Sequence, residues 1–303
     1  MKLLRATFLS IRGIPDLTWD LGRAGSESPH AISVVTGPSG SGKTRVLEAI
    51  ATAKEVLGSY GPPPDADAWI RPGDRGAKIE LTFVLDESER RTAGQTPAVV
   101  RGEALFGPQG VRAEIDDGVV DLLERYEHDA ARPKWDYVPA TRSIPLLGAP
   151  HGTSAIEQRA LRLKRDPRKY AFVPRFLAET AGDRRDRFGA ALAILCPSLQ
   201  FLGVTASEPT GAFSSRGHKA VGIDDLAQSE QDAVIFAATA ALVRLDRSIW
   251  LVDRPESSTD ERTAGAFVAA LAALAEDVQL IVASSSPNIL ASVDPAASLH
   301  LAV

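Results

Sequence analysis

Residues 31–44 read AISVVTGPSGSGKT, and this stretch decides the fold. The run Ala31–Thr36 is apolar and rich in β-branched side chains, as in a strand buried on both faces. GPSGSGKT then satisfies the pattern G-x-x-x-x-G-K-[ST], and from Thr44 to Leu57 apolar residues recur at helical spacing. Strand, glycine-rich turn and helix in this order predict a phosphate-binding loop, here called the P-loop. The nucleotide-binding residues predicted in it are Gly37, Pro38, Ser39, Gly40, Ser41, Gly42, Lys43 and Thr44.

Each residue type in the P-loop has a physical role in holding a phosphate. Glycines let the loop curl so that backbone N–H groups point inward, and the helix N-terminus adds partial positive charge. The Lys43 ammonium can reach the outer phosphates, and the Thr44 hydroxyl can ligate Mg²⁺. The alternative is a glycine-rich strand-to-helix turn with a solvated lysine.

A P-loop needs a second acidic residue, at the end of another buried strand, to hold Mg²⁺. The segment Ile249–Asp253 reads IWLVD and supplies four apolar residues followed by a carboxylate. We therefore predict that Asp253 and Thr44 are the metal-binding residues and that Asp253 also belongs to the nucleotide site. The alternative is an aspartate that begins an ordinary surface turn.

The composition sets the class of protein. The chain has 303 residues, 44% hydrophobic and 24% charged, with a net charge of -5, so it is neither disordered nor a generally basic nucleic-acid coat. Cys196 is the only cysteine, which excludes an intrachain disulfide and a cysteine zinc cage. We expect a cytoplasmic protein, because the sequence has neither a signal-peptide pattern nor an apolar run of about eighteen residues.

The order of the expected elements predicts an α/β fold with a mostly parallel sheet. Strands and helices alternate at both ends of the chain, whereas charged helical segments fill the middle. We therefore expect a discontinuous core of residues 1–115 and 200–303, with residues 116–199 as an inserted helical lobe. The expected strands outside the P-loop region include 78–85, 98–106, 248–252, 279–283 and 298–303, and the later helices are 229–245 and 261–275.

The order of the motifs resembles that of ABC-type ATPases, in the branch that includes SMC, RecF and OLD-type heads. Residues 8–14 (FLSIRGI) are similar to the strand and turn that precede the P-loop in this branch, and residues 252–256 (VDRPE) resemble its Walker B segment. Residues 280–290 (LIVASSSPNIL) resemble the switch-histidine strand. The signature motif of the family resembles a segment that consists of Leu226, Ala227, Gln228, Ser229 and Glu230, here called the signature segment.

The resemblance implies a P-loop NTPase of ABC-ATPase type that binds ATP and Mg²⁺, but the hydrolytic positions depart from the family. Arg254 stands where the family has the catalytic glutamate, and Ser285 where it has the switch histidine. Ala227 and Ser229 replace the serine and glycine of the signature. Because an arginine cannot accept a proton from water, these changes favour a nucleotide binder with weak or absent hydrolysis.

Three alternatives stay open. Glu256 or Asp260 can take over the role of the base, which would give an active, DNA-stimulated ATPase. The chain can complete a composite site with a competent partner subunit. It can also be a structural pseudo-ATPase whose pocket stays empty.

The resemblance also implies partners. Two heads of this family sandwich nucleotide through the signature and D-loop regions, the latter at residues 257–260 here, so we expect a homodimer or a hetero-oligomer with another ATPase or effector subunit. By analogy, such a complex would act in bacterial DNA repair or phage defence. Arg12 is a candidate for the border of the adenine or a phosphate. The basic residues between Arg159 and Arg187 can bind nucleic acid or form a solvated helical face. No Q-loop glutamine is evident in residues 137–142.

Overall fold

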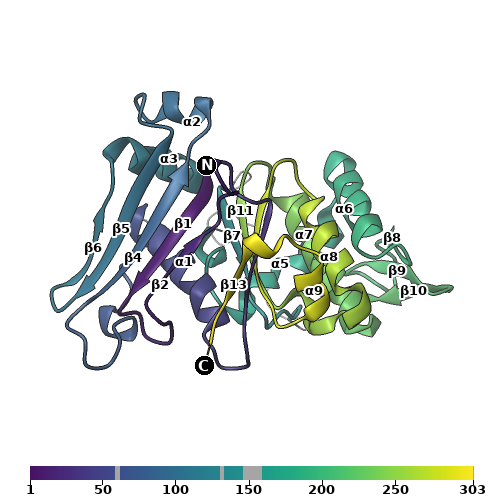
Figure 1. Ribbon diagram of the computed structural model, residues 1–303. Coiled ribbons are helices and arrows are strands. Elements are labelled where there is room, and N and C mark those ends of the chain that lie inside the picture. Colours follow the sequence, from purple (N-terminus) through teal and green to yellow (C-terminus); the bar gives the residue numbers. More distant parts are fainter. Residues whose placement is uncertain (59–61, 130–132, 146–158, 303) are drawn as a thin grey trace.

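The computed structural model describes residues 1–58, 62–129, 133–145 and 159–302. Three sheets and the helices between them form an α/β fold, and its layers stand side by side in Figure 1. Within the described ranges, no helix is both long enough and apolar enough to cross a membrane. The predicted α/β class is confirmed.

A five-stranded parallel sheet carries the P-loop. Its order is β13-β3-β12-β11-β7, and all neighbouring strands run parallel. Its strands are β3 (Ile32–Thr36), β7 (Trp135–Val138), β11 (Ile249–Asp253), β12 (Gln279–Ala283) and β13 (Ser298–His300). Both β11 and β12 are buried along their whole length, because helices cover both faces of the sheet. The predicted parallel sheet is confirmed.

An antiparallel sheet of order β2-β1-β4-β5-β6 forms the second layer. Its strands are β1 (Lys2–Leu9), β2 (Leu17–Asp20), β4 (Ala77–Val84), β5 (Val99–Gly107) and β6 (Gly110–Glu114). The helix α1 (Lys43–Leu57) lies between this sheet and the parallel sheet (Figure 1). Side chains of β4 alternate between buried and half-buried positions, because one face of the strand packs toward α1.

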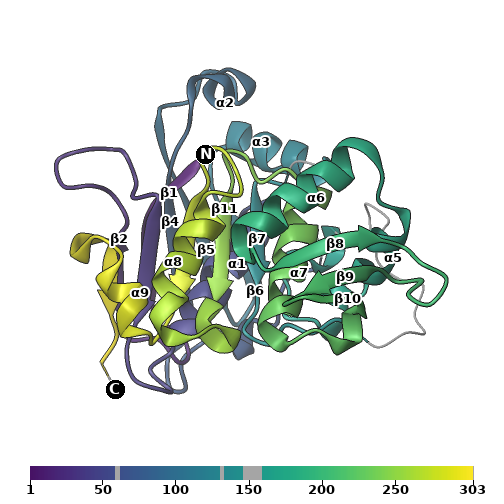
Figure 2. The ribbon, with the colours of Figure 1, turned by 90° about the vertical axis from the view of Figure 1, so that its right-hand side faces the viewer.

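Helices cover the opposite face of the parallel sheet, and a third sheet lies beyond these helices (Figure 2). The helices are α5 (Phe172–Glu179), α6 (Gly182–Leu195), α7 (Gln228–Leu242), α8 (Ala264–Ala272) and α9 (Pro287–Ala291). The third sheet is antiparallel, in the order β10-β9-β8. Its strands are β8 (Leu199–Gly203), β9 (Ala212–Ser215) and β10 (His218–Gly222).

Short helices complete the fold. They are α2 (Glu87–Thr92), α3 (Asp117–His128) and the 3-10 helices η1 (Ala66–Ala68), η2 (Pro167–Tyr170), η3 (Ile223–Asp225), η4 (Pro255–Ser258), η5 (Glu261–Thr263) and η6 (Pro295–Ala297). The range 116–199 contains α3, α5 and α6, but also β7, which pairs with β11 in the central sheet. Residues 130–132 and 146–158 of that range lie outside the described residues. The boundaries of an inserted lobe therefore stay a prediction.

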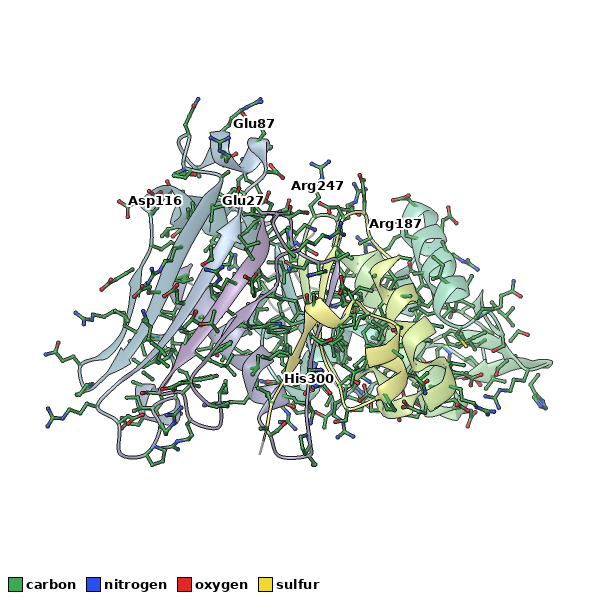
Figure 3. All side chains as sticks on the ribbon, viewed as in Figure 1. Glu27, Glu87, Asp116, Arg187, Arg247 and His300 are labelled. Carbon is green, nitrogen blue, oxygen red and sulfur yellow. The ribbon has the colours of Figure 1, made fainter. Side chains whose placement is uncertain are left out.

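Some elements differ from the sequence expectations. The antiparallel strands β6, β8, β9 and β10 were not anticipated. The helix expected at 229–245 ends at Leu242, because Val243 is extended, and the one expected at 261–275 begins with η5 before α8. Figure 3 shows charged side chains such as Glu87, Asp116 and Arg247 on the outside of the molecule.

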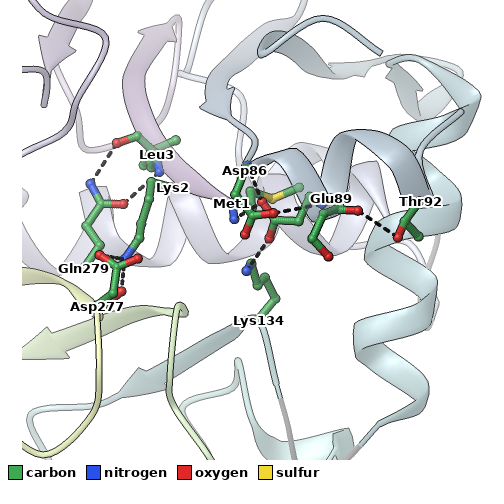
Figure 4. A network of polar contacts seen from close by, with 10 residues as sticks. Met1, Lys2, Leu3, Asp86, Glu89, Thr92, Lys134, Asp277 and Gln279 are labelled. Atoms are coloured by element: carbon green, nitrogen blue, oxygen red, sulfur yellow. Dashed lines mark hydrogen bonds and ion pairs between the residues drawn. The ribbon is translucent and has the colours of Figure 1, made fainter. Parts of the chain in front are cut away.

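Buried polar contacts tie the first strand to the rest of the molecule (Figure 4). The Gln279 amide bonds both backbone groups of Leu3: its Oε1 accepts from Leu3 N at 2.7 Å, and its Nε2 donates to Leu3 O at 2.7 Å. The buried carboxylate of Glu89 forms ion pairs with the Met1 amino group and with Lys134. These contacts join β1 of the antiparallel sheet to β12 of the parallel sheet and to α2.

Candidate nucleotide-binding site

The P-loop connects β3 to α1 and is shaped by glycines in left-handed conformations. Gly37, Gly40 and Gly42 have φ angles of 147°, 83° and 97°. A Cβ at Gly37 would collide with the carbonyl oxygen of Leu301, and one at Gly42 with that of Gly13. The loop therefore has a backbone path that requires glycine at these positions.

Polar groups of the P-loop converge on its interior. Lys43 Nζ donates to the carbonyl oxygens of Gly37 and Pro38, at 2.7 Å in each case. Partial burial is the main cause that lowers the pKa of Lys43, and the positive charge of Arg254 lowers it further. Ser41 Oγ is buried and, within the described part of the chain, has no hydrogen-bond partner. The loop thus brings together the Lys43 ammonium, the Ser41 hydroxyl and the backbone carbonyls of Gly37 and Pro38.

The two predicted metal-binding residues meet across the sheet. Thr44 Oγ1 donates to Asp253 Oδ2 at 2.9 Å, although the two residues are far apart in the sequence. Asp253 is only 1% exposed, and its Oδ1 has no hydrogen-bond partner among the described residues. Burial raises the pKa of Asp253, and the hydrogen bond from Thr44 opposes that shift. A buried carboxylate oxygen with a free lone pair beside a threonine hydroxyl fits Mg²⁺, which prefers oxygen ligands.

The turn around Arg12 packs directly against the P-loop. Arg12 is exposed, and its backbone N donates to Trp69 O at 2.8 Å. Arg45, the residue after Thr44, lies with its guanidinium carbon 3.5 Å from the centre of the Trp69 ring and donates to Arg12 O at 3.3 Å. Two guanidinium groups therefore border the loop here: Arg12, a candidate named from the sequence, and Arg45, which sequence reasoning did not name. The position of Arg45 directly after the motif was the available signal.

The turn after β11 carries the residues that depart from the family pattern. Arg254 has a left-handed conformation with φ of 48°, its N donates to Ala283 O at 2.8 Å, and its side chain is exposed. Glu256 Oε1 accepts from Ser285 N at 3.2 Å, and Ser285 Oγ donates to Gly37 O at 3.4 Å. Glu256 Oε2 is buried and has no partner in the part of the chain that the structure describes. Glu256 and Ser285 therefore lie at the rim of the P-loop.

Asp260, the other candidate base, is engaged elsewhere. Its Oδ1 accepts from Arg262 N at 2.9 Å, and its carboxylate forms an ion pair with the Arg262 guanidinium at 3.2 Å. These contacts with Arg262 lower the pKa of Asp260. The residue caps η5, so the geometry brings Glu256 rather than Asp260 to the P-loop.

The signature segment forms the N-terminal turn of α7. Leu226 and Glu230 are buried, and Glu230 Oε2 accepts from Ala227 N at 3.0 Å, which caps the helix. Ala227 and Gln228 are exposed, and Ser229 is half-buried. The part of the segment that can contact another molecule is therefore smaller than the predicted stretch of five residues.

A buried arginine, which sequence reasoning did not assign, connects α7 to the turn after β11. Arg142 follows β7, in the region where no Q-loop glutamine is evident. Its guanidinium donates to Asp232 Oδ2 at 2.9 Å, to Asp253 O at 2.9 Å, to Arg254 O at 3.1 Å and to Ser257 Oγ at 2.7 Å. Its acceptors belong to segments far away in the sequence, so the residues around Arg142 gave no signal for this role.

The basic run from Arg159 to Arg187 does not form one continuous basic face. Arg162 and Lys169 are buried, and Lys169 donates to Asp136 at 2.7 Å. Three further arginines form ion pairs with carboxylates close in the sequence, namely Arg168 with Asp166, Arg175 with Glu179 and Arg187 with Asp183. At least half of the ten basic residues in the run are thus either buried or paired.

Comparisons with known proteins bear on the fold. No protein-family model matches the sequence, and no curated protein matches it. Three solved structures of SMC heads are similar over nearly the whole chain. The Smc head bound to the C-winged helix domain of ScpA has a TM-score of 0.59 and 12% identity, covering 97% of this chain and 92% of that chain.

Two further similar structures come from named organisms. The SMC head domain from Thermotoga maritima has a TM-score of 0.56 and 14% identity, covering 97% of this chain and 93% of that chain. The Smc head with an extended coiled coil, bound to the C-terminal domain of ScpA derived from Pyrococcus furiosus, has a TM-score of 0.60 and 14% identity, covering 96% and 92%. The protein therefore has, over nearly its whole length, the fold of SMC head domains, which are ABC-type ATPase heads.

Proposed function

We propose that the protein binds ATP and Mg²⁺ in the P-loop and uses the bound nucleotide to control its association with another subunit. The observation that carries this proposal is the hydrogen bond of 2.9 Å from Thr44 Oγ1 to Asp253 Oδ2, beside the buried Asp253 Oδ1, which has no partner among the residues that the structure describes. The Lys43 ammonium and the backbone N–H groups of the P-loop would bind the phosphates. Mg²⁺ would neutralise phosphate charge there, held by Thr44 and Asp253.

Thermal unfolding with and without ATP and Mg²⁺ tests the binding. At a concentration of about one hundred times Kd, nucleotide should stabilise the wild type by about 2.7 kcal/mol. Lys43→Ala should abolish that shift and leave the unliganded melting temperature nearly unchanged, because Lys43 is only half-buried. An unchanged melting temperature of the wild type at millimolar ATP would refute the proposal and favour the structural pseudo-ATPase with an empty pocket.

We further propose that hydrolysis by the isolated chain is weak or absent. Arg254 occupies the position next to Asp253, and its guanidinium cannot act as a base. Steady-state phosphate release should then equal that of Lys43→Ala. If turnover appears only after a second subunit is added, the composite site is favoured instead.

A second candidate function is an active ATPase that uses Glu256 as its base. Its carboxylate lies at the rim of the P-loop with Oε2 buried and unpartnered among the described residues, which favours this candidate over one that uses Asp260. Glu256→Gln should then lower turnover by about 10²- to 10⁴-fold, the usual contribution of a general base, without weakening ATP binding. Asp260→Asn is the matched control and should keep its turnover, with or without DNA.

The partner and the setting are proposed from the fold. Two of the similar structures are SMC heads bound to domains of ScpA, so we propose either a second copy of this chain or a different subunit as the partner. A role in bacterial DNA repair or phage defence, in the cytoplasm, rests on the analogy with SMC, RecF and OLD-type heads alone. Nucleic-acid binding through the basic run has reduced support, because at least half of its members are buried or paired.

A further inference from the structure

The Arg142 guanidinium is a fully used hydrogen-bonding group inside the protein. Its side chain is 1% exposed. Besides Asp232, Asp253, Arg254 and Ser257, it donates to Pro139 O at 3.1 Å. A guanidinium has five N–H donors in a fixed plane, and these acceptors account for all of them. The group therefore sets the relative positions of every segment that it touches.

Asp232, the acidic partner, belongs to the first turns of α7, directly behind the signature segment. Its Oδ1 accepts from Gln228 Nε2 at 3.1 Å, and its Oδ2 accepts from Ser258 Oγ at 2.6 Å as well as from Arg142. Asp232 is 3% exposed. One carboxylate thus contacts the exposed Gln228 of the signature segment and Ser258 of the D-loop, while the arginine reaches the end of β11.

The acceptors at the end of β11 are backbone carbonyls. Arg142 donates to the carbonyl oxygens of Asp253 and Arg254, and Arg254 has a left-handed conformation with φ of 48°. A non-glycine residue holds that conformation when surrounding contacts fix it. The positive charge of Arg142 also lowers the pKa of Asp253, although burial, which raises it, is the larger effect.

We propose that Arg142 is a positioning residue that links the signature segment to Asp253. A contact made on Gln228 by another molecule would move Asp232, and the buried guanidinium would pass that movement to the backbone of Asp253 and to Ser257. The proposal deepens the proposed function, since it says how association at one end of α7 changes the Mg²⁺ side of the nucleotide site.

Hydrogen exchange tests the link without any ligand. In Arg142→Lys, which keeps the charge but loses the planar fork, the amides of Glu230 and Gln231 in α7 and of Arg254 and Ser257 in the turn after β11 should all exchange about tenfold faster. Asp232→Asn should show the same two-segment pattern. Arg71→Lys is the matched control, because Arg71 also bonds a backbone carbonyl and a carboxylate but lies away from α7. Faster exchange in α7 alone would overturn the proposal.

Nucleotide affinity gives the second readout. In Arg142→Lys, the affinity for ATP without Mg²⁺ should stay within about threefold of the wild type, while the gain in affinity from Mg²⁺ falls about 10- to 100-fold, the usual effect of losing a partner behind a metal ligand. An equal weakening of both affinities in a folded Arg142→Lys variant would overturn the proposal. Ser257→Ala, which removes a single acceptor, should show the same selective loss at smaller size if the lysine variant does not fold. If the wild type binds no ATP, the proposed function fails, and hydrogen exchange still decides the role of Arg142.

Discussion

Asp253 combines two properties that oppose each other. It is a carboxylate at the end of a fully buried strand, so its charged form is unfavourable in the unliganded protein, and burial raises its pKa. The same burial removes competing water from the oxygen that a cation would use. The charged Asp253 carboxylate therefore lowers the stability of the unliganded protein, while its buried oxygen stays available to a cation.

The first prediction concerns Asp253→Asn. A carboxyl whose pKa is raised by folding contributes stability below its unfolded value, near 3.8, and loses it as the pH rises through the folded value. The unliganded variant should therefore be more stable than the wild type at pH 7.5, and its advantage should shrink as the pH is lowered toward 4. Urea unfolding at several pH values measures this difference.

The matched control is Asp224→Asn, at an exposed aspartate in η3. Its stability should stay within about 0.5 kcal/mol of the wild type at every pH. If Asp253→Asn behaves in the same way as the control, the charge of Asp253 costs the fold nothing. In either case the variant should lose the part of the ATP-induced stabilisation that depends on Mg²⁺.

At the scale of elements, the P-loop shows how backbone shape limits the choice of residue. Gly40 and Gly42 both have positive φ angles, of 83° and 97°. A Cβ at Gly40 would meet nothing within 4 Å, whereas a Cβ at Gly42 would collide with the carbonyl oxygen of Gly13. A substitution at Gly40 would therefore strain the backbone only, whereas one at Gly42 would strain the backbone and also cause a steric collision.

The second prediction compares Gly42→Ala with Gly40→Ala. The left-handed conformation alone costs an alanine about 1–2 kcal/mol, so Gly40→Ala should lose about that much stability. Gly42→Ala should lose more, because the turn around Gly13 must also move. Equilibrium unfolding in urea measures both values. Equal losses would contradict the close approach of the two turns.

The elements and residues that the sequence predicted are those with local signals. The P-loop is a contiguous motif, and Asp253 follows a run of apolar residues, so both were found from neighbouring residues alone. The strands β8, β9 and β10 are short and lack a clear alternation of apolar and polar residues. Arg142 could not be assigned, because its acceptors in α7 and after β11 come next to it only when the chain folds.

At the scale of the whole molecule, the two large sheets must keep a fixed relation for α1 to fit between them. The Gln279 amide contributes to this by bonding both backbone groups of Leu3, and Gln279 and Leu3 are 1% and 0% exposed. These hydrogen bonds form the joint between β1 and β12. Because water cannot replace them, the joint depends on the side chain of Gln279.

The third prediction concerns Gln279→Leu, which keeps the size of the side chain and removes both hydrogen bonds. An unsatisfied buried polar group costs about 1–3 kcal/mol, so two such groups should lower the free energy of unfolding by at least about 2 kcal/mol. Gln200→Leu, at an exposed position in β8, is the control and should change stability by about 0.5 kcal/mol or less. Chemical denaturation measures both, and similar losses would show that the joint is not a special point of the fold.

The order of the strands also sets the order in which the molecule can be made. All five strands of the antiparallel sheet come from residues 2–114, so that layer can form early while the ribosome is still extending the chain. β3, in contrast, pairs with β12 and β13, which follow all the other strands in the chain. Pairing between strands so distant in sequence is slow. The P-loop is translated early but is held in place by its sheet only after β12 and β13 have been translated, so a chain truncated before β12 would carry the complete motif without the neighbouring strands of β3.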